Sequence, residues 1–361
     1  MILLNDFKKQ YALIKDQMDS AISRVLESGW YILGNELKAF ETEFADFIGV
    51  SYCVGVASGT EAIALSLMAL GIGKGDEVIV PCFTAFPTIT GILQAGAIPV
   101  LADVSPDDGL INAGNIRKKI SKRSRAVVPV HLYGQSCDMD PLLNLADSFG
   151  LKVVEDCAQS AGATYRGRQT GSFGICSAFS FYPTKNLGAL GDAGAVVTKD
   201  KTIYEKLLSL RNYGQSVRYY HDHAGINSRM DEIQAAVLRT KLNYLAAWND
   251  RRRQIAEIYR ETLEEAQVIR KNQYGNPCYH LFVIKSPERD ALISFLQSRG
   301  IQALIHYPVP VNRQKAFPEQ KNEIFSGSEY LASVVASIPV YPELTDEEAE
   351  NIISTLHAFR K

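Results

Sequence analysis

Short apolar runs alternate with helical stretches between residues 50 and 200, and this alternation constrains the fold more than any other feature. The runs are mostly continuous and rich in β-branched residues, a pattern typical of strands covered on both faces. The expected strands are Tyr52–Val56, Glu77–Val80, Ile98–Ala102, Ala126–Val130, Lys152–Glu155, Cys176–Ser180 and Ala195–Thr198, with helices at Glu61–Leu70, Thr88–Ala95 and Met139–Phe149. Strand–helix–strand repetition predicts an α/β fold with a mainly parallel sheet wrapped by helices.

The second half of the chain changes character. From Met230 to about Leu263 apolar residues recur at helical intervals, which predicts one long amphipathic helix with the arginine run 251–253 on its solvated face. A strand at Leu281–Ile284 and helices at Arg289–Arg299 and Asp346–His357 follow, as in a small α+β domain. Because 361 residues exceed one ordinary core, we predict a large domain with an N-terminal arm at 1–245 and a small C-terminal domain at 246–361.

Composition narrows the classes of partner. A net charge of −2 gives no electrostatic reason to expect nucleic acid or an anionic membrane, and no apolar run approaches the roughly 20 residues that span a bilayer. The N-terminus lacks the layout of a signal peptide, and the six cysteines lie far apart. These features predict a cytoplasmic protein with reduced cysteines. No metal site is predicted, because His221 and His223 lie in a polar loop and are expected to face solvent.

Two segments contain candidate binding groups at strand ends. The residues Ser58-Gly59-Thr60 lead from a strand into a helix, where free amides make an anion site suited to phosphate. The alternative is that Ser58 only caps the helix. Asp156 follows a buried strand, where α/β sheets place ligands, and it could pair with a protonated ring nitrogen or cap the next helix.

Two further segments complete the set. The stretch Ser180-Phe181-Tyr182-Pro183-Thr184-Lys185 delivers a lysine in a turn beside the sheet edge, where partial desolvation lowers its pKa and improves it as a nucleophile. Asn227 precedes the long helix as a cap or as an anion contact across a dimer interface. Pyridoxal phosphate (PLP) requires a lysine, an acid and a phosphate cradle, and the chain supplies all three from different strand–helix junctions.

Several motifs in the same order resemble the DegT/DnrJ/EryC1/StrS family of sugar aminotransferases over essentially the full length. They are S-G-T-E-A (58–62), E-D-C-A-Q (155–159), S-F-Y-P-T-K-N-L-G (180–188), R-N-Y-G (211–214), N-S-R-M-D-E (227–232) and H-Y-P-V-P (306–310). The resemblance implies PLP-dependent fold type I, the fold of aspartate aminotransferase, and a homodimer with shared active sites.

The resemblance also implies roles for individual residues. Lys185 would bind PLP covalently and later move a proton between cofactor and substrate, and Asp156 would pair with the pyridinium. Gln159 would contact the phenolic oxygen of PLP. The phosphate would be held by residues from both subunits, namely Ser58, Gly59, Thr60, Ser180 and, from the neighbouring subunit, Asn227.

One position departs from the family. Members often have an aromatic residue directly after the threonine of a T-[FY]-x-A-T stretch, where it stacks on the cofactor ring. Here the stretch is Thr84-Ala85-Phe86-Pro87-Thr88. Phe86 is the candidate for the stacking residue, with the alternative that the ring is covered in another way.

The substrate is also inferred from resemblance. Lys185 argues against the dehydratase branch, and the residues around Tyr182 and the loop before Gly225 resemble enzymes that aminate C3 of dTDP-3-keto-6-deoxyhexoses with L-glutamate as donor. In that branch Tyr182, His306, Tyr307 and Arg218 would contact the sugar and diphosphate. The alternatives are a UDP-2-acetamido-3-keto sugar, a C4 keto nucleotide sugar and a non-catalytic PLP-binding regulator.

Overall fold

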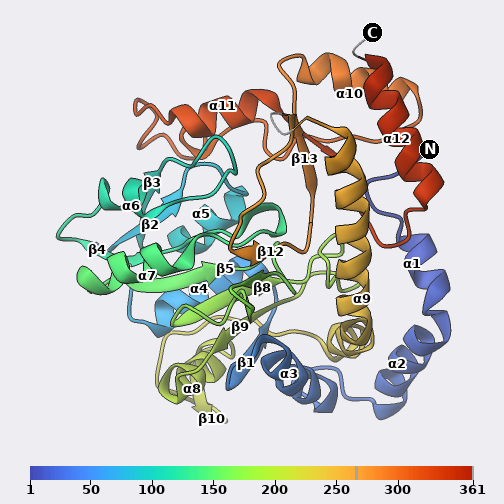
Figure 1. Cartoon of the computed structure of the whole chain (residues 1–361). Helices are drawn as coiled ribbons and strands as arrows, with labels where there is room; N and C mark the ends of the chain where they lie inside the picture. Colours follow the sequence, from blue (N-terminus) through green and yellow to red (C-terminus); the bar gives the residue numbers. More distant parts are fainter. Residues whose placement is uncertain (265–266, 360–361) are drawn as a thin grey trace.

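A seven-stranded sheet forms the centre of the protein, which a computed structural model describes over residues 1–264 and 267–359 (Figure 1). Its spatial order is β1-β9-β8-β5-β4-β2-β3. Strand β9 runs antiparallel to both neighbours, and the other pairings are parallel. The strands are β1 (Tyr52–Val56), β2 (Glu77–Pro81), β3 (Ile98–Ala102), β4 (Ser124–Val127), β5 (Lys152–Asp156), β8 (Cys176–Ser180) and β9 (Gly194–Thr198).

Helices cover both faces of the sheet, as the apolar runs predict. Along β2, Val78 and Val80 face a core shared with α4 (Gly59–Ala69), α5 (Phe86–Gln94) and α8 (Lys201–Leu210). Ile79 points to the opposite face, because successive strand residues alternate. That face is covered by α3 (Asn35–Ile48), α7 (Met139–Ser148) and α9 (Glu232–Thr262).

The predicted strands match the observed ones closely, with one shift. Strand β4 was expected at Ala126–Val130 but spans Ser124–Val127. Pro129 has no amide hydrogen to donate to a ladder, so regular pairing stops before it. A single bridge between Val130 and Asp156 continues the direction of the strand.

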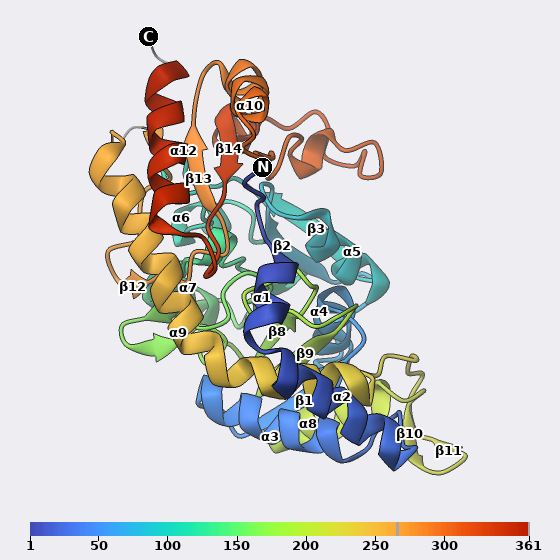
Figure 2. The same cartoon turned by 90° about the vertical axis from the view of Figure 1, so that its right-hand side faces the viewer.

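The C-terminal part is a small α+β unit, as predicted. Strands β13 (Phe282–Lys285) and β14 (Val335–Ile338) pair antiparallel, accompanied by α10 (Arg289–Ser298), α11 (Ser326–Val334) and α12 (Asp346–Phe359). Figures 1 and 2 show α9 running from the level of α3 to α12. The predicted boundary at 245/246 falls inside α9, so this helix belongs to both parts. The division into domains itself stays a prediction.

The arginine run on α9 corrects one expectation. Arg252 is not on a solvated face but buried, with its guanidinium donating to the carbonyls of Tyr279 and Val340. Its neighbour Arg251 pairs with Asp346 at 2.7 Å. Arg252 lies four residues after Trp248 and three before Ile255, so helical periodicity places it on the same inward face as these two buried residues.

The remaining elements are short or peripheral. They are α1 (Phe7–Leu13), α2 (Lys15–Ser28), α6 (Ala113–Arg117), β6 (Thr164–Tyr165), β7 (Arg168–Gln169), β10 (Gln215–Val217), β11 (Tyr220–His221), β12 (Gly275–Asn276) and the 3-10 turns η1 (Leu132–Gly134) and η3 (Val311–Arg313). All six cysteines are buried and free, as their spacing predicts. Within the described residues, no helix is both long and apolar enough to cross a membrane.

Candidate active site

The carboxyl ends of β1, β5 and β8 open onto one cavity of about 280 Å³. These three strands are mutually parallel, so residues that follow them meet at the same sheet edge. The cavity brings together eight residues that the sequence singled out: Ser58, Gly59, Thr60, Asp156, Gln159, Ser180, Tyr182 and Lys185.

Strand alternation gives the two acids of β5 different surroundings. Asp156 lies on the same face of β5 as Val154, which packs into the core shared with α4 and α5. The carboxylate of Asp156 lines the cavity. Glu155 lies on the opposite face of the strand, together with Val153. One of the two adjacent carboxylates is therefore available to a ligand.

The Asp156 carboxylate is fixed on both oxygens. One oxygen accepts a hydrogen bond from the Thr88 hydroxyl at 2.8 Å, and the other accepts from the Ala158 amide at 3.0 Å. Burial raises the pKa of this carboxyl, although these hydrogen bonds and the charge of Lys185 oppose the rise. A buried carboxylate at this edge is suited to a cationic partner such as a pyridinium nitrogen.

Two glycines, Gly59 and Gly194, allow the end of β8 and the start of β9 to contact the start of α4. Helix α4 begins at Gly59, and the Ser58 hydroxyl accepts from the Glu61 amide at 3.2 Å, so its predicted capping role is realised. A Cβ added to Gly59 would lie 2.6 Å from the Ser180 Cβ. An added Cβ on Gly194 would likewise collide with the backbone of Ser58. The free amides and the two hydroxyls form a cradle for an anion such as phosphate.

Lys185 lies in a tight turn directly after β8. Its amide donates to the Tyr182 carbonyl at 2.8 Å, and the Ala189 amide donates back to the Phe181 carbonyl at 2.8 Å. Burial lowers the pKa of the Lys185 amine to about 8, with the Asp156 charge opposing the shift. A substantial neutral fraction near physiological pH makes the amine a nucleophile for an aldehyde.

Gln159 connects the cavity to two other loops. Its side-chain oxygen accepts from the Tyr133 amide at 2.7 Å, and its nitrogen donates to the Tyr307 hydroxyl at 2.9 Å. The first bond fixes which end of the amide faces the cavity, leaving one N–H free to donate to a ligand.

Other predicted residues lie outside the cavity wall. Phe86, the first residue of α5, packs against the core beneath this helix and α4. Its neighbours Ala85 and Pro87 line the cavity instead. This arrangement gives no support to stacking of Phe86 on the cofactor ring. Asn227 and Arg218 are both exposed, and the Arg218 guanidinium lies 5.1 Å from the centre of the Tyr219 ring.

His306 and Tyr307 are half-buried in the loop after Leu304. Nδ1 of His306 lies 2.9 Å from the Ser337 hydroxyl, and burial together with the Lys185 charge lowers the pKa of the imidazole to about 4. His306 is therefore neutral at pH 7.

Sequence reasoning missed Thr88, which fixes the orientation of Asp156. Its hydroxyl is 3.2 Å from that of Thr84, so a chain of two threonines leads to the carboxylate. The available signal was their spacing of four residues at a helix start, since α5 begins at Phe86.

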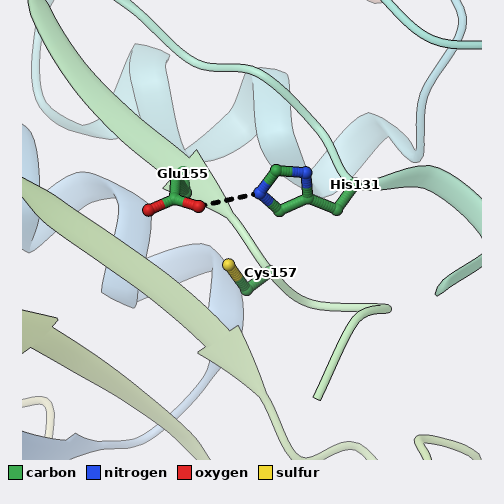
Figure 3. A group of neighbouring side chains, drawn as sticks. All are labelled: His131, Glu155 and Cys157. Carbon is green, nitrogen blue, oxygen red and sulfur yellow. Dashed lines mark hydrogen bonds and ion pairs between the residues drawn. The ribbon is translucent and has the colours of Figure 1, made fainter. Parts of the chain in front are cut away.

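His131, Glu155 and Cys157 form a buried group with the composition of a metal site (Figure 3). Nδ1 of His131 already accepts from the Cys137 amide at 3.1 Å, so Nε2 carries the proton and donates to Glu155 at 2.9 Å. Burial raises the pKa of the Cys157 thiol well above its usual value.

The Glu155 carboxylate is saturated with donors, because it also accepts from three backbone amides and a serine hydroxyl, those of Gly171, Phe173, Gly174 and Ser177. Burial opposes its ionisation, but these bonds and His131 lower its pKa. The group is a hydrogen-bonded support for the loop before β8, and its lone pairs are already engaged.

The cavity fits PLP by the chemistry of its donors. The cradle formed by the start of α4 and the Ser180 hydroxyl, called the Gly59–Ser180 cradle below, suits the phosphate. The buried carboxylate of Asp156 suits the ring nitrogen, and the amine of Lys185 suits the aldehyde. The fold and this site together define an α/β aminotransferase of fold type I. The pattern of the DegT/DnrJ/EryC1/StrS aminotransferase family matches residues 12–357. The chain belongs to this family.

Individual relatives agree over nearly their whole length. The chain is 44% identical to dTDP-3-amino-3,6-dideoxy-alpha-D-galactopyranose transaminase of Aneurinibacillus thermoaerophilus, covering 99% of both chains. It is 42% identical to UDP-N-acetyl-3-dehydro-alpha-D-glucosamine 3-aminotransferase of Acidithiobacillus ferrooxidans, covering 97% and 96%. The crystal structure of DesV from S. venezuelae, in complex with a ketimine intermediate, superposes with a TM-score of 0.97 at 43% identity, covering 100% and 98%.

Proposed function

We propose that the enzyme uses PLP to transfer an amino group from L-glutamate to C3 of a dTDP-3-keto-6-deoxyhexose. The products are a dTDP-3-amino-3,6-dideoxyhexose and 2-oxoglutarate. The observation that carries the proposal is the convergence of Lys185, Asp156 and the Gly59–Ser180 cradle on one cavity. The similarity to a dTDP-3-amino sugar transaminase supports the choice of sugar.

Each residue has a distinct task in this proposal. Lys185 binds the cofactor covalently and then moves a proton, and Asp156 keeps the ring nitrogen protonated. Gln159 donates to the phenolic oxygen through its free N–H. When bound, PLP supplies an electron sink for the carbon that loses its proton.

The substrate side of the site involves Tyr182, His306, Tyr307 and Arg218. Tyr182 is exposed at the rim of the cavity, which suits contact with a sugar. Because the pKa of His306 is low, it contributes to binding as a neutral hydrogen-bonding group. Arg218 supplies a charge for the diphosphate from the exposed β10–β11 hairpin.

We further propose a cytoplasmic homodimer in which Asn227 completes the neighbouring subunit's phosphate site. Asn227 is exposed, while the adjacent Ser228 is buried and donates to Glu61 at 2.5 Å on its own α4. Large apolar side chains are exposed nearby and at the end of α2, at Tyr219, Tyr220, Leu26 and Trp30. Burial of such side chains is typical of subunit interfaces.

Three alternatives rank below this proposal. The similarity to a UDP-N-acetyl-3-dehydro-glucosamine aminotransferase favours a UDP-2-acetamido-3-keto sugar as the second candidate, ahead of a C4 keto sugar. A non-catalytic PLP-binding regulator is disfavoured because binding alone does not require a lysine with a pKa of about 8 beside the acid.

The test is an absorbance spectrum of the purified protein with PLP, before and after adding L-glutamate. We expect a visible band from the bond to Lys185 that disappears with glutamate, and no such band in Lys185→Ala. A wild-type protein without the band overturns the proposal. Turnover of dTDP-3-keto against UDP-2-acetamido-3-keto and 4-keto sugars then distinguishes the substrates.

A further inference from the structure

The loop that carries Lys185 is attached to α9 by side chains from the helix's inner face. Gln234 accepts a hydrogen bond from the Leu190 amide at 2.8 Å. Seven residues later, the amine of Lys241 donates to the Gly188 carbonyl at 2.8 Å. A spacing of seven returns to nearly the same side of a helix, so both contacts come from one face.

A third contact follows eight residues further along α9. The side-chain nitrogen of Asn186 donates to the Asn249 side-chain oxygen at 2.7 Å and to the Cys278 carbonyl at 2.8 Å. Asn249 in turn donates to the Ala161 carbonyl at 3.0 Å. Asn186 directly follows Lys185, so these bonds fix the backbone on the far side of the lysine.

Lys241 is the unusual member of this set, because it is a cation with only 4% of its surface exposed. Burying an ammonium group costs free energy that an apolar residue of the same length would not cost. Burial lowers the pKa of Lys241 to about 8, with the Glu343 charge opposing the shift. In both protonation states the amine keeps an N–H for the Gly188 carbonyl.

The Gly188 carbonyl lies in the closed part of the turn. An added Cβ at Gly188 would collide with the Pro183 carbonyl, so the chain doubles back there on the residues just before Lys185. Fixing this carbonyl therefore limits the movement of the whole turn, including the Cα of Lys185.

We propose that Lys241 is a positioning residue for Lys185. The buried amine of Lys241 fixes the Gly188 carbonyl and thereby determines the position of the Lys185 amine in the cavity. This inference rests on the proposed PLP chemistry of Lys185. Lys241 itself does not line the cavity, so it acts through the loop.

The experiment compares wild type with Lys241→Met and Lys241→Gln, both purified and loaded with PLP. Methionine matches the length without a donor, and glutamine retains an N–H. Arg239→Met is the matched control, because Arg239 lies on the same helix but pairs with Glu43 and Glu36 on α3. The readouts are the rate of appearance of the lysine–cofactor band, the rate of its loss with L-glutamate, and the thermal midpoint of the protein without cofactor.

We expect Lys241→Met to slow both band appearance and band loss by about tenfold or more, since misplacing a reacting group by about 1 Å costs on the order of 100-fold. The half-saturating glutamate concentration and the thermal midpoint should stay near those of the control, and Lys241→Gln should recover part of the rate. Rates within about twofold of wild type, or an equal loss in Arg239→Met, overturn the positioning role. Absence of the band in wild type overturns the proposed function instead, so the two failures are distinguishable.

Discussion

The side-chain nitrogen of Gln159 donates a hydrogen bond of 2.9 Å to the hydroxyl of Tyr307. The two residues lie 148 positions apart, one after β5 and the other in the loop before η3. A residue of the sheet edge that faces the cavity is therefore oriented by a residue of the C-terminal part.

Replacing Tyr307 by phenylalanine should weaken the enzyme moderately. Loss of one net hydrogen bond is worth about 0.5–1.5 kcal/mol, so we expect a loss of about two- to tenfold in PLP affinity or turnover. The control is Tyr133→Phe, because the Tyr133 hydroxyl donates to the His306 carbonyl while Gln159 is contacted by the Tyr133 backbone. Equal losses in both variants would show that loop anchoring, not Gln159, is responsible.

Asp156→Asn should reduce turnover by at least about 100-fold, the usual cost of removing a key electrostatic group. The fold should survive, since asparagine retains an oxygen for the Ala158 amide. The pKa of Asp156 is raised in the folded state, so the ionised carboxylate lowers stability above that pKa, and the apo variant at pH 7 should unfold at an equal or higher temperature. Calorimetry of the apo proteins checks the sign, and near-normal turnover would reassign the acid.

Capture of PLP by the apo protein should depend on pH through Lys185. The neutral amine is the reactive form, and its fraction rises with pH through a pKa of about 8. The capture rate should therefore rise with a midpoint near pH 8 and level off about one pH unit above it, measured by stopped-flow absorbance. Asp156→Asn should move the midpoint lower, because the Asp156 charge raises this pKa. A rate still rising steeply above pH 9.5 would indicate an ordinary lysine.

Gly59→Ala should damage the phosphate cradle. The new Cβ would lie 2.6 Å from the Ser180 Cβ, and overpacking of this kind costs about 1–3 kcal/mol. We expect a lower thermal midpoint and at least about tenfold weaker PLP binding by equilibrium titration. A second change, Ser180→Gly, should recover part of the stability but not the affinity. Recovery of both would mean that the Ser180 hydroxyl contributes little.

Sequence patterns predicted the elements well because their signals are local. Seven apolar runs became the seven strands of the sheet, and the helix expected from Met230 to Leu263 spans Glu232–Thr262. The cavity residues after β1, β5 and β8 were also predictable, since parallel strands deliver their carboxyl ends to one edge.

Contacts between distant segments were not predictable in this way. Helical periodicity places Lys241 and Arg252 on the buried face of α9, but it does not identify the carbonyls of Gly188 and Val340 that accept their hydrogen bonds. The Tyr307–Gln159 bond likewise depends on how the C-terminal part docks. Such pairs are set by tertiary packing, for which one sequence gives no local signal.

The continuity of α9 has a consequence for building chimaeras between related enzymes. A crossover at residue 245 would take Lys241 from one parent and Asn249 from the other, although both residues fix the same lysine loop. A crossover before Phe181 or after Thr262 keeps the whole helix and the 181–189 loop in one parent. Recombination libraries aimed at new sugar specificities should therefore inherit α9 and the 181–189 loop from the same parent.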